Sequence, residues 1–147
     1  MAKQQDTINY NQLFMIFVFI IGIVLFSISW SVDEKLQTTS CTSKPLKTSN
    51  KLVLCIGTIL IAFSLSFFGC STYCEKTFDS GPSLLMHVAG IFVLGILLTV
   101  LGGIINANSI DNCSNSASSS TIWVLGVLLT IISVLYFYMK FKNVKRN

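Results

Sequence analysis

The chain has 147 residues, of which 52% are hydrophobic and only 11% are charged, and its formal net charge is +4. Soluble domains carry roughly 25% charged residues, so this composition excludes an ordinary water-soluble globular protein. The basic excess is small and part of it is a short C-terminal tail, which is too little for a nucleic-acid-binding surface.

Four apolar stretches without a formally charged side chain make up more than half of the chain: Leu13–Val32, Leu52–Cys70, Leu84–Ile105 and Thr121–Met139. Roughly 20 helical residues span a hydrocarbon core of roughly 30 Å, and lipid offers the backbone no other hydrogen-bond partners. The polar connections are shorter than the roughly 40 residues that a free-standing domain needs. The sequence therefore predicts an all-α integral membrane protein, an antiparallel four-helix bundle with short loops, as one domain over residues 1–147.

The first span is predicted to stay in the protein as a signal anchor. It is longer than the roughly 7–15 apolar residues of a cleaved signal peptide, and no small-residue cleavage site follows it. Aromatic side chains such as Phe14, Phe17 and Trp30 give it a bulky surface that suits lipid or a partner protein better than the wall of a pore.

The two sides of the membrane differ in charge. Six of the ten Lys and Arg residues lie on the side of the chain ends and four on the other side, so the positive-inside tendency places the termini in the cytosol. Cys41 and Cys113 then share the opposite, oxidising side, where they either form a disulfide between the two loops or remain two unpaired thiols.

Small residues at steps of four mark two of the spans as packing surfaces, because small side chains let helices in lipid approach closely. The second span has Thr58, Ala62 and Ser66, and the third has Gly95, Thr99 and Gly103. A short connection makes these spans antiparallel neighbours, so we expect the two stripes to pack against each other. A seam between subunits is the alternative.

Few residues suggest chemistry. Cys70 and Cys74 form a possible local thiol pair, and with His87 they offer three metal ligands where a structural zinc site usually has four. His87, one turn inside the third span, is predicted to be an interfacial hydrogen-bonding residue, with a proton relay as the alternative. We find no catalytic set, no cofactor motif and no site for a small-molecule substrate, so we expect no enzymatic activity.

The general organisation resembles the small multi-span inner-membrane and minor capsid proteins of large icosahedral double-stranded DNA viruses. The resemblance rests on short loops, featureless apolar spans, a basic tail, and Lys, Asn and Ile usage with a single arginine, Arg146. It implies a structural role in a virion's inner membrane, and in a host endomembrane during assembly, with the bilayer and capsid proteins as partners. Contacts with partners are expected at Trp30, Lys44, Lys47, Trp123, Lys140, Lys142, Lys145 and Arg146.

Two other functions are compatible with the same residues. One is an accessory subunit of a cellular membrane complex. The other is a small oligomeric channel or transporter, with the glycine-rich third span lining the pore.

Overall fold

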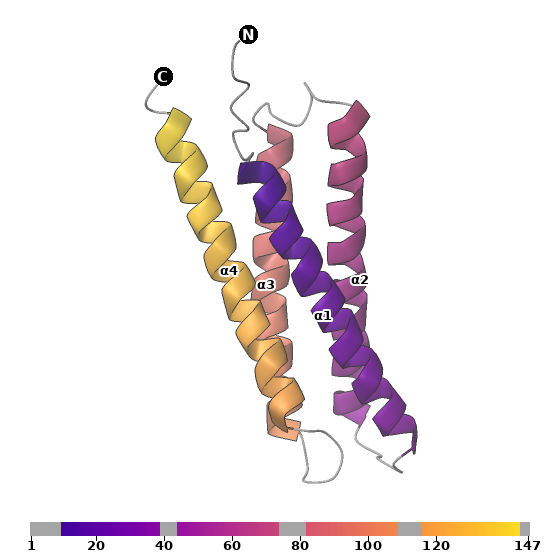
Figure 1. The fold of residues 1–147 in the computed structure, drawn as a ribbon. Coiled ribbons are helices and arrows are strands. Elements are labelled where there is room, and N and C mark those ends of the chain that lie inside the picture. The colour runs from indigo at the N-terminus through magenta and orange to yellow at the C-terminus, as the bar shows by residue number, and fades with distance from the viewer. Residues whose placement is uncertain (1–9, 39–43, 74–81, 109–115, 145–147) are drawn as a thin grey trace.

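The computed structural model describes residues 10–38, 44–73, 82–108 and 116–144. They form four helices, α1 (Tyr10–Thr38), α2 (Lys44–Tyr73), α3 (Pro82–Asn108) and α4 (Ser116–Val144). The helices run antiparallel, and the start of α1 and the end of α4 lie at the same end of the bundle (Figure 1). We call this the terminal end and the opposite one the loop end. The predicted all-α four-helix bundle is confirmed.

The helices extend beyond the predicted spans, most of all at the loop end. There α1 continues past Val32 and α2 begins well before Leu52. Leu36 and Leu46, one in each extension, are buried, so packing holds these turns together beyond the apolar core. Pro45 stands in the first turn of α2, where a missing N–H group costs no helical hydrogen bond.

The helices are not equally close to one another. α1 packs mainly against α2 and α3 mainly against α4, whereas α2 touches α3, and α1 touches α4, over shorter stretches. The bundle therefore consists of two helical hairpins, α1–α2 and α3–α4.

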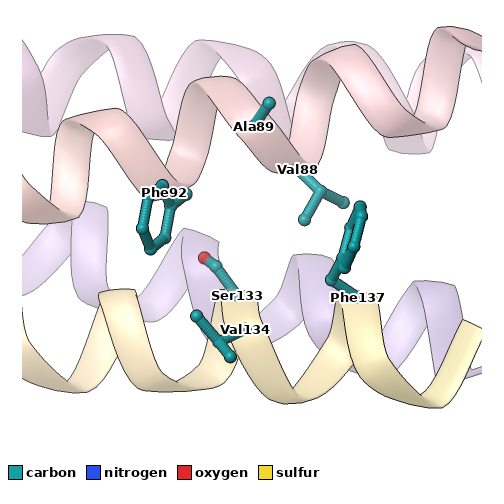
Figure 2. Close-up of a pocket in the computed structure, with 6 residues that line it drawn as sticks. All are labelled: Val88, Ala89, Phe92, Ser133, Val134 and Phe137. Atoms are coloured by element: carbon teal, nitrogen blue, oxygen red, sulfur yellow. The ribbon is translucent and has the colours of Figure 1, made fainter. Parts of the chain in front are cut away.

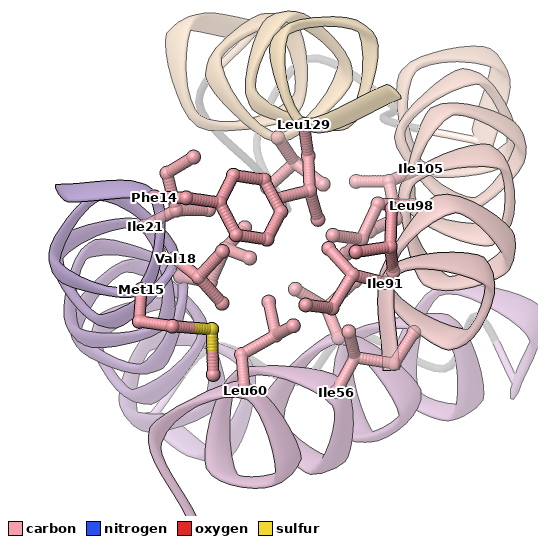
Figure 3. Close-up of a cluster of buried hydrophobic side chains, with 14 of the residues drawn as sticks. Phe14, Met15, Val18, Ile21, Ile56, Leu60, Ile91, Leu98, Ile105 and Leu129 are labelled. Atoms are coloured by element: carbon pink, nitrogen blue, oxygen red, sulfur yellow. The ribbon is translucent and has the colours of Figure 1, made fainter. Parts of the chain in front are cut away.

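The centre of the bundle is filled by aliphatic side chains. Each helix contributes to this centre a leucine that is 0% exposed, and these are Leu25, Leu60, Leu98 and Leu129. Figure 3 shows labelled members of this cluster from all four helices converging on the middle of the bundle. Because they come from every side, they close the axis of the bundle.

The two hairpins repeat one pattern of burial. Each buried residue described in α3 corresponds to a buried residue of α1 when Gly95 is aligned with Gly22, and each in α4 corresponds to one of α2 when Gly126 is aligned with Gly57. For α1 and α3 the matched positions, in order, are Met15, Val18, Gly22, Leu25, Ser29 and Val32 with Val88, Ile91, Gly95, Leu98, Gly102 and Ile105. For α2 and α4 they are Asn50, Val53, Gly57, Leu60, Ser64 and Phe67 with Ser119, Ile122, Gly126, Leu129, Ser133 and Tyr136. The chain is thus built from two similar hairpins, a repeat that the sequence analysis missed.

Candidate functional site

Glycines bring the backbones of each hairpin together. In α1–α2, a Cβ atom built on Gly22 would lie 3.1 Å from the backbone nitrogen of Ile61, and one built on Gly57 would lie 3.0 Å from that of Phe26. Such distances leave almost no room for a side chain, so a larger residue at either glycine forces the helices apart. The first hairpin is therefore held by a glycine seam that sequence analysis did not single out.

The second hairpin has the tighter seam. A Cβ atom on Gly126 would lie 2.6 Å from the backbone nitrogen of Thr99, and one on Gly95 would lie 2.6 Å from Oγ1 of Thr130. Gly102 continues this seam toward the loop end, where its Cβ would be 2.7 Å from the backbone nitrogen of Trp123. α3 and α4 thus meet backbone to backbone along two turns or more.

The small-residue stripes of the second and third spans do not meet as expected. Thr58, Ala62 and Ser66 lie on an exposed face of α2, and Gly103 has nothing within 4 Å of a built Cβ. Gly95 and Thr99 do lie in a seam, but their close neighbours belong to α4. The reason is that spacing identifies a small-residue face without specifying which helix meets it, and a short connection requires only that two helices be adjacent. A seam between subunits remains a prediction for the exposed stripe of α2.

Buried polar side chains join the helices near the loop end. In the first hairpin, Ser29 Oγ lies 2.7 Å from the backbone oxygen of Asn50 and 2.9 Å from its Oδ1, and Asn50 Nδ2 donates to the Ser29 carbonyl at 2.9 Å. In the second, Ser119 Oγ donates to Asn106 Oδ1 at 3.0 Å. Interhelical hydrogen bonds of this kind stabilise helix pairs in membranes by about 0.6 kcal/mol on average, and they also fix the register of the two helices.

Aromatic contacts link the two hairpins at the terminal end. Tyr136 donates a hydrogen bond to Asn11 and stacks on Phe14 with ring centroids 4.4 Å apart, which ties α4 to α1. His87 meets Phe63 edge to face at 5.5 Å, which ties α3 to α2. His87 therefore lies in a contact between the hairpins, and its hydrogen-bonding role at the membrane interface stays a prediction.

Other hydroxyl groups within the spans, unlike that of Ser29, bond to their own helices. Thr58, Ser64, Thr99, Thr130 and Ser133 each donate to the carbonyl four residues earlier, at 2.7–2.9 Å. Among the described residues, no buried side-chain nitrogen or oxygen lacks a hydrogen-bond partner. These hydroxyls are therefore compatible with an apolar environment.

The predicted partner contacts that the structure describes lie on the outside. Trp30 is 60% exposed and Trp123 is 47% exposed, and Lys44 and Lys47 are exposed at the start of α2. Lys140 and Lys142 lie on α4, where only the backbone is described, and Lys145 and Arg146 lie outside the described residues.

The cysteine predictions fall largely outside the description. Cys41, Cys74 and Cys113 are not among the described residues, and of Cys70 only the backbone is. Cys55 is a free cysteine on the exposed side of α2. Within residues 10–38, 44–73, 82–108 and 116–144, no group of three or more His, Cys, Asp or Glu side chains is placed to hold a metal ion.

Each of the four helices contains a segment long and apolar enough to cross a bilayer, which together with the bundle defines a multi-pass helical membrane protein. No protein-family model matches the chain, and no curated protein or solved structure matches it either. The argument for a function therefore rests on the chain's own residues and their arrangement.

Proposed function

We propose that the chain is a structural subunit of a large membrane-bound assembly, in which it anchors neighbouring proteins to the bilayer. The observation that carries this proposal is the filled centre of the bundle. Conduction or transport requires a route lined by polar groups or water, whereas Leu25, Leu60, Leu98 and Leu129 are 0% exposed and close the axis. A rigid, closed bundle with its polar groups satisfied is suited to holding other proteins in place.

The outer surface provides the places where such proteins would dock. Trp30 and Trp123 expose large rings at the loop end, and tryptophan is enriched in protein interfaces as well as at the membrane boundary. Lys44 and Lys47 add exposed positive charge at the same end. We therefore expect the partner to dock at the loop end with a surface that carries acidic side chains and accepts the tryptophan rings.

In its sharper form, the proposal locates the chain in the inner membrane of a virion, where it ties that membrane to the capsid shell. Its support is the general organisation described above, namely short connections, apolar spans, a basic tail and a single arginine. The termini would then face the cytosol while the membrane is still part of the host. An accessory subunit of a cellular membrane complex has the same design and differs in its partners.

A channel lined by the third span is less well supported. Gly95 and Gly102 of α3 are in close contact with α4, so neither is available to line a pore unless the hairpin opens. Conductance in reconstituted liposomes that changes when Thr99 is enlarged would favour the channel over the structural subunit.

The proposal predicts that the chain leaves the membrane together with fixed partners. Extraction of the tagged full chain in a mild detergent, followed by quantitative mass spectrometry, should recover assembly proteins in a constant ratio to it. The double substitution Lys44→Gln and Lys47→Gln should lower the ratio of assembly proteins to the chain severalfold, because charges at the rim of an interface guide docking. Leu65→Ala, in the apolar part of α2, should leave this ratio unchanged.

Recovery with capsid proteins supports the virion form of the proposal, and recovery with subunits of a cellular complex supports a structural role while refuting the virion. Recovery of the chain alone, as a homogeneous homo-oligomer, refutes a structural subunit.

A further inference from the structure

The second hairpin encloses an apolar groove near the terminal end. α3 and α4 are held together by the glycine seam and separate toward the terminal end (Figure 1). The space between them there is a cavity of about 260 Å³. Its lining residues are Val88, Ala89, Phe92, Ser133, Val134 and Phe137, shown in Figure 2.

The lining is suited to hydrocarbon. Ser133 is its one polar residue, and the Ser133 hydroxyl already donates to the Leu129 carbonyl at 2.7 Å. An apolar cavity of about 150 Å³ stays dry and binds a molecule of the size of benzene, so this larger groove accommodates a longer piece of hydrocarbon. Val134 and Phe137 are about half exposed, which leaves the groove open to the bilayer, where acyl chains surround it.

The sequence becomes basic just after the last residue that lines the groove. The groove-lining residue Phe137 is followed on α4 by Lys140 and Lys142, and the sequence then adds Lys145 and Arg146. Three residues on an α-helix rise about 4.5 Å along nearly the same face, so the backbone of Lys140 lies one turn closer to the membrane surface. No Asp or Glu occurs between Tyr136 and the C-terminus, which makes this segment complementary to a phosphate-bearing headgroup.

The internal repeat shows what gives the groove its room. When Gly95 is aligned with Gly22, the position of Ala89 is taken in the first hairpin by Ile16. The corresponding position of Phe92 is also a phenylalanine, Phe19, whereas Val88 corresponds to Met15 and Val134 to Leu65, so Ala89 is the largest of three reductions in bulk. The small side chain of Ala89 thus opens the second hairpin where the first has a larger residue.

From these observations we propose that the groove between α3 and α4 binds one acyl chain of an anionic phospholipid, whose headgroup charge is complementary to the basic sequence that follows Phe137. The lipid would fill the space at the terminal end, where α3 and α4 separate beyond the glycine seam. This inference is independent of the assembly to which the chain belongs, because it requires only that α3 and α4 span a membrane.

Native mass spectrometry of the full chain in mild detergent tests the proposal, with phosphatidylserine and phosphatidylcholine as titrants. We expect one phosphatidylserine to bind at least fivefold more tightly than phosphatidylcholine. Ala89→Ile should weaken phosphatidylserine binding about tenfold, and Ile16 at the matching position indicates that the hairpin tolerates this bulk. Gly90→Ala is the control, since a Cβ there meets nothing within 4 Å.

The headgroup part of the proposal has its own variants. Removing the charge of Lys140 and Lys142 with Lys→Gln substitutions should reduce the preference for phosphatidylserine about fivefold for each lysine, since each basic residue near an anionic surface contributes about that factor. Equal affinity for both lipids that Ala89→Ile leaves unchanged overturns the proposal. A dimer that Ala89→Ile dissociates also overturns it, because a second copy of the chain would then fill the groove.

A second measurement does not depend on how Ala89→Ile folds. Phe92→Trp, made in a chain with Trp30→Phe and Trp123→Phe, places a single fluorophore in the lining of the groove. In liposomes, phosphatidylserine with brominated acyl chains should quench it more strongly than brominated phosphatidylcholine at equal mole fraction. Equal quenching by the two lipids contradicts the proposal.

Discussion

Gly102→Ala is expected to destabilise the bundle by about 1–3 kcal/mol, the usual cost of overpacking a well-packed contact. The added Cβ would lie 2.7 Å from the backbone nitrogen of Trp123 and 2.8 Å from its Cα. Because backbone cannot rotate away as a side chain can, α3 and α4 must move apart. The unfolding free energy, measured by titrating the folded protein in mixed detergent micelles and following circular dichroism, reports this loss.

The neighbouring glycine is the matched control. A Cβ on Gly103 meets nothing within 4 Å, so Gly103→Ala should leave stability unchanged or raise it by up to about 1 kcal/mol through better helix propensity. The displaced helices of Gly102→Ala should also weaken the hydrogen bond between Ser119 and Asn106, one turn away. Equal effects of the two substitutions would show that α3 and α4 do not meet at Gly102.

Leu60→Ala is expected to cost about 2 kcal/mol, at the low end of the range for a buried leucine. Leu60 is 0% exposed in the centre of the bundle, and its truncation leaves a cavity between helices. The expected cost is at the low end because the side chain is surrounded by hydrocarbon even when the helices separate in lipid. The truncation therefore loses packing contacts but no free energy of transfer from water. The same titration in mixed micelles measures it.

Leu65 on the same helix provides the comparison, because it is 54% exposed. Leu65→Ala removes the same atoms from a surface in contact with lipid, so a change below about 0.5 kcal/mol is expected. If Leu65→Ala destabilised the protein as much as Leu60→Ala, α2 would be rotated relative to the orientation described.

The spans themselves were predictable because lipid leaves the backbone one option. Each predicted apolar stretch lies within a helix, and the all-α bundle follows from that requirement. The boundaries were less accurate. The segment from Lys44 to Lys51 contains three lysines and lies outside the predicted spans, yet its Leu46 and Asn50 are buried at helical spacing with Val53 of the second span. This periodicity is a signal that the sequence contains and that the charges obscured.

The partners of the small-residue faces could not be read from spacing. Gly95 and Thr99 lie in a seam, but with α4 and not with the predicted second span, because every neighbouring span also offers apolar and small side chains. In lipid, hydrophobicity gives helices no reason to prefer one neighbour over another, so the choice depends on the detailed fit of the surfaces. That fit is visible only in three dimensions, as with Gly126 against Thr99.

The internal repeat was available in the sequence but faint. Few identical residues connect the hairpins, among them the pairs Gly22 and Gly95, and Gly57 and Gly126, which occupy matching seams. Elsewhere one aliphatic residue replaces another, which preserves burial without preserving identity. Apolar spans of any kind share such substitutions, so only the glycines and the buried pair Ser64 and Ser133 separate a repeat from ordinary transmembrane composition.

The pairing of α1 with α2 and of α3 with α4 is the claim on which the closed axis, the glycine seams and the lipid groove all depend. Disulfide crosslinking tests it in a chain whose five cysteines have been replaced. One variant carries Gly95→Cys and Thr130→Cys. A Cβ atom on residue 95 has its only contact below 3.0 Å with the hydroxyl oxygen of Thr130, and Thr130→Cys removes that hydroxyl. The other carries Gly95→Cys and Thr58→Cys, which links α3 to the stripe of α2 at nearly the same level of the bundle, as the contact between Phe63 and His87 sets it.

The structure predicts that mild oxidation in the membrane forms an intramolecular disulfide in the first variant and none in the second, as read from the masses of the resulting peptides. A disulfide between positions 58 and 95, without one between 95 and 130, would show that α3 packs against α2 instead and would contradict the two-hairpin bundle.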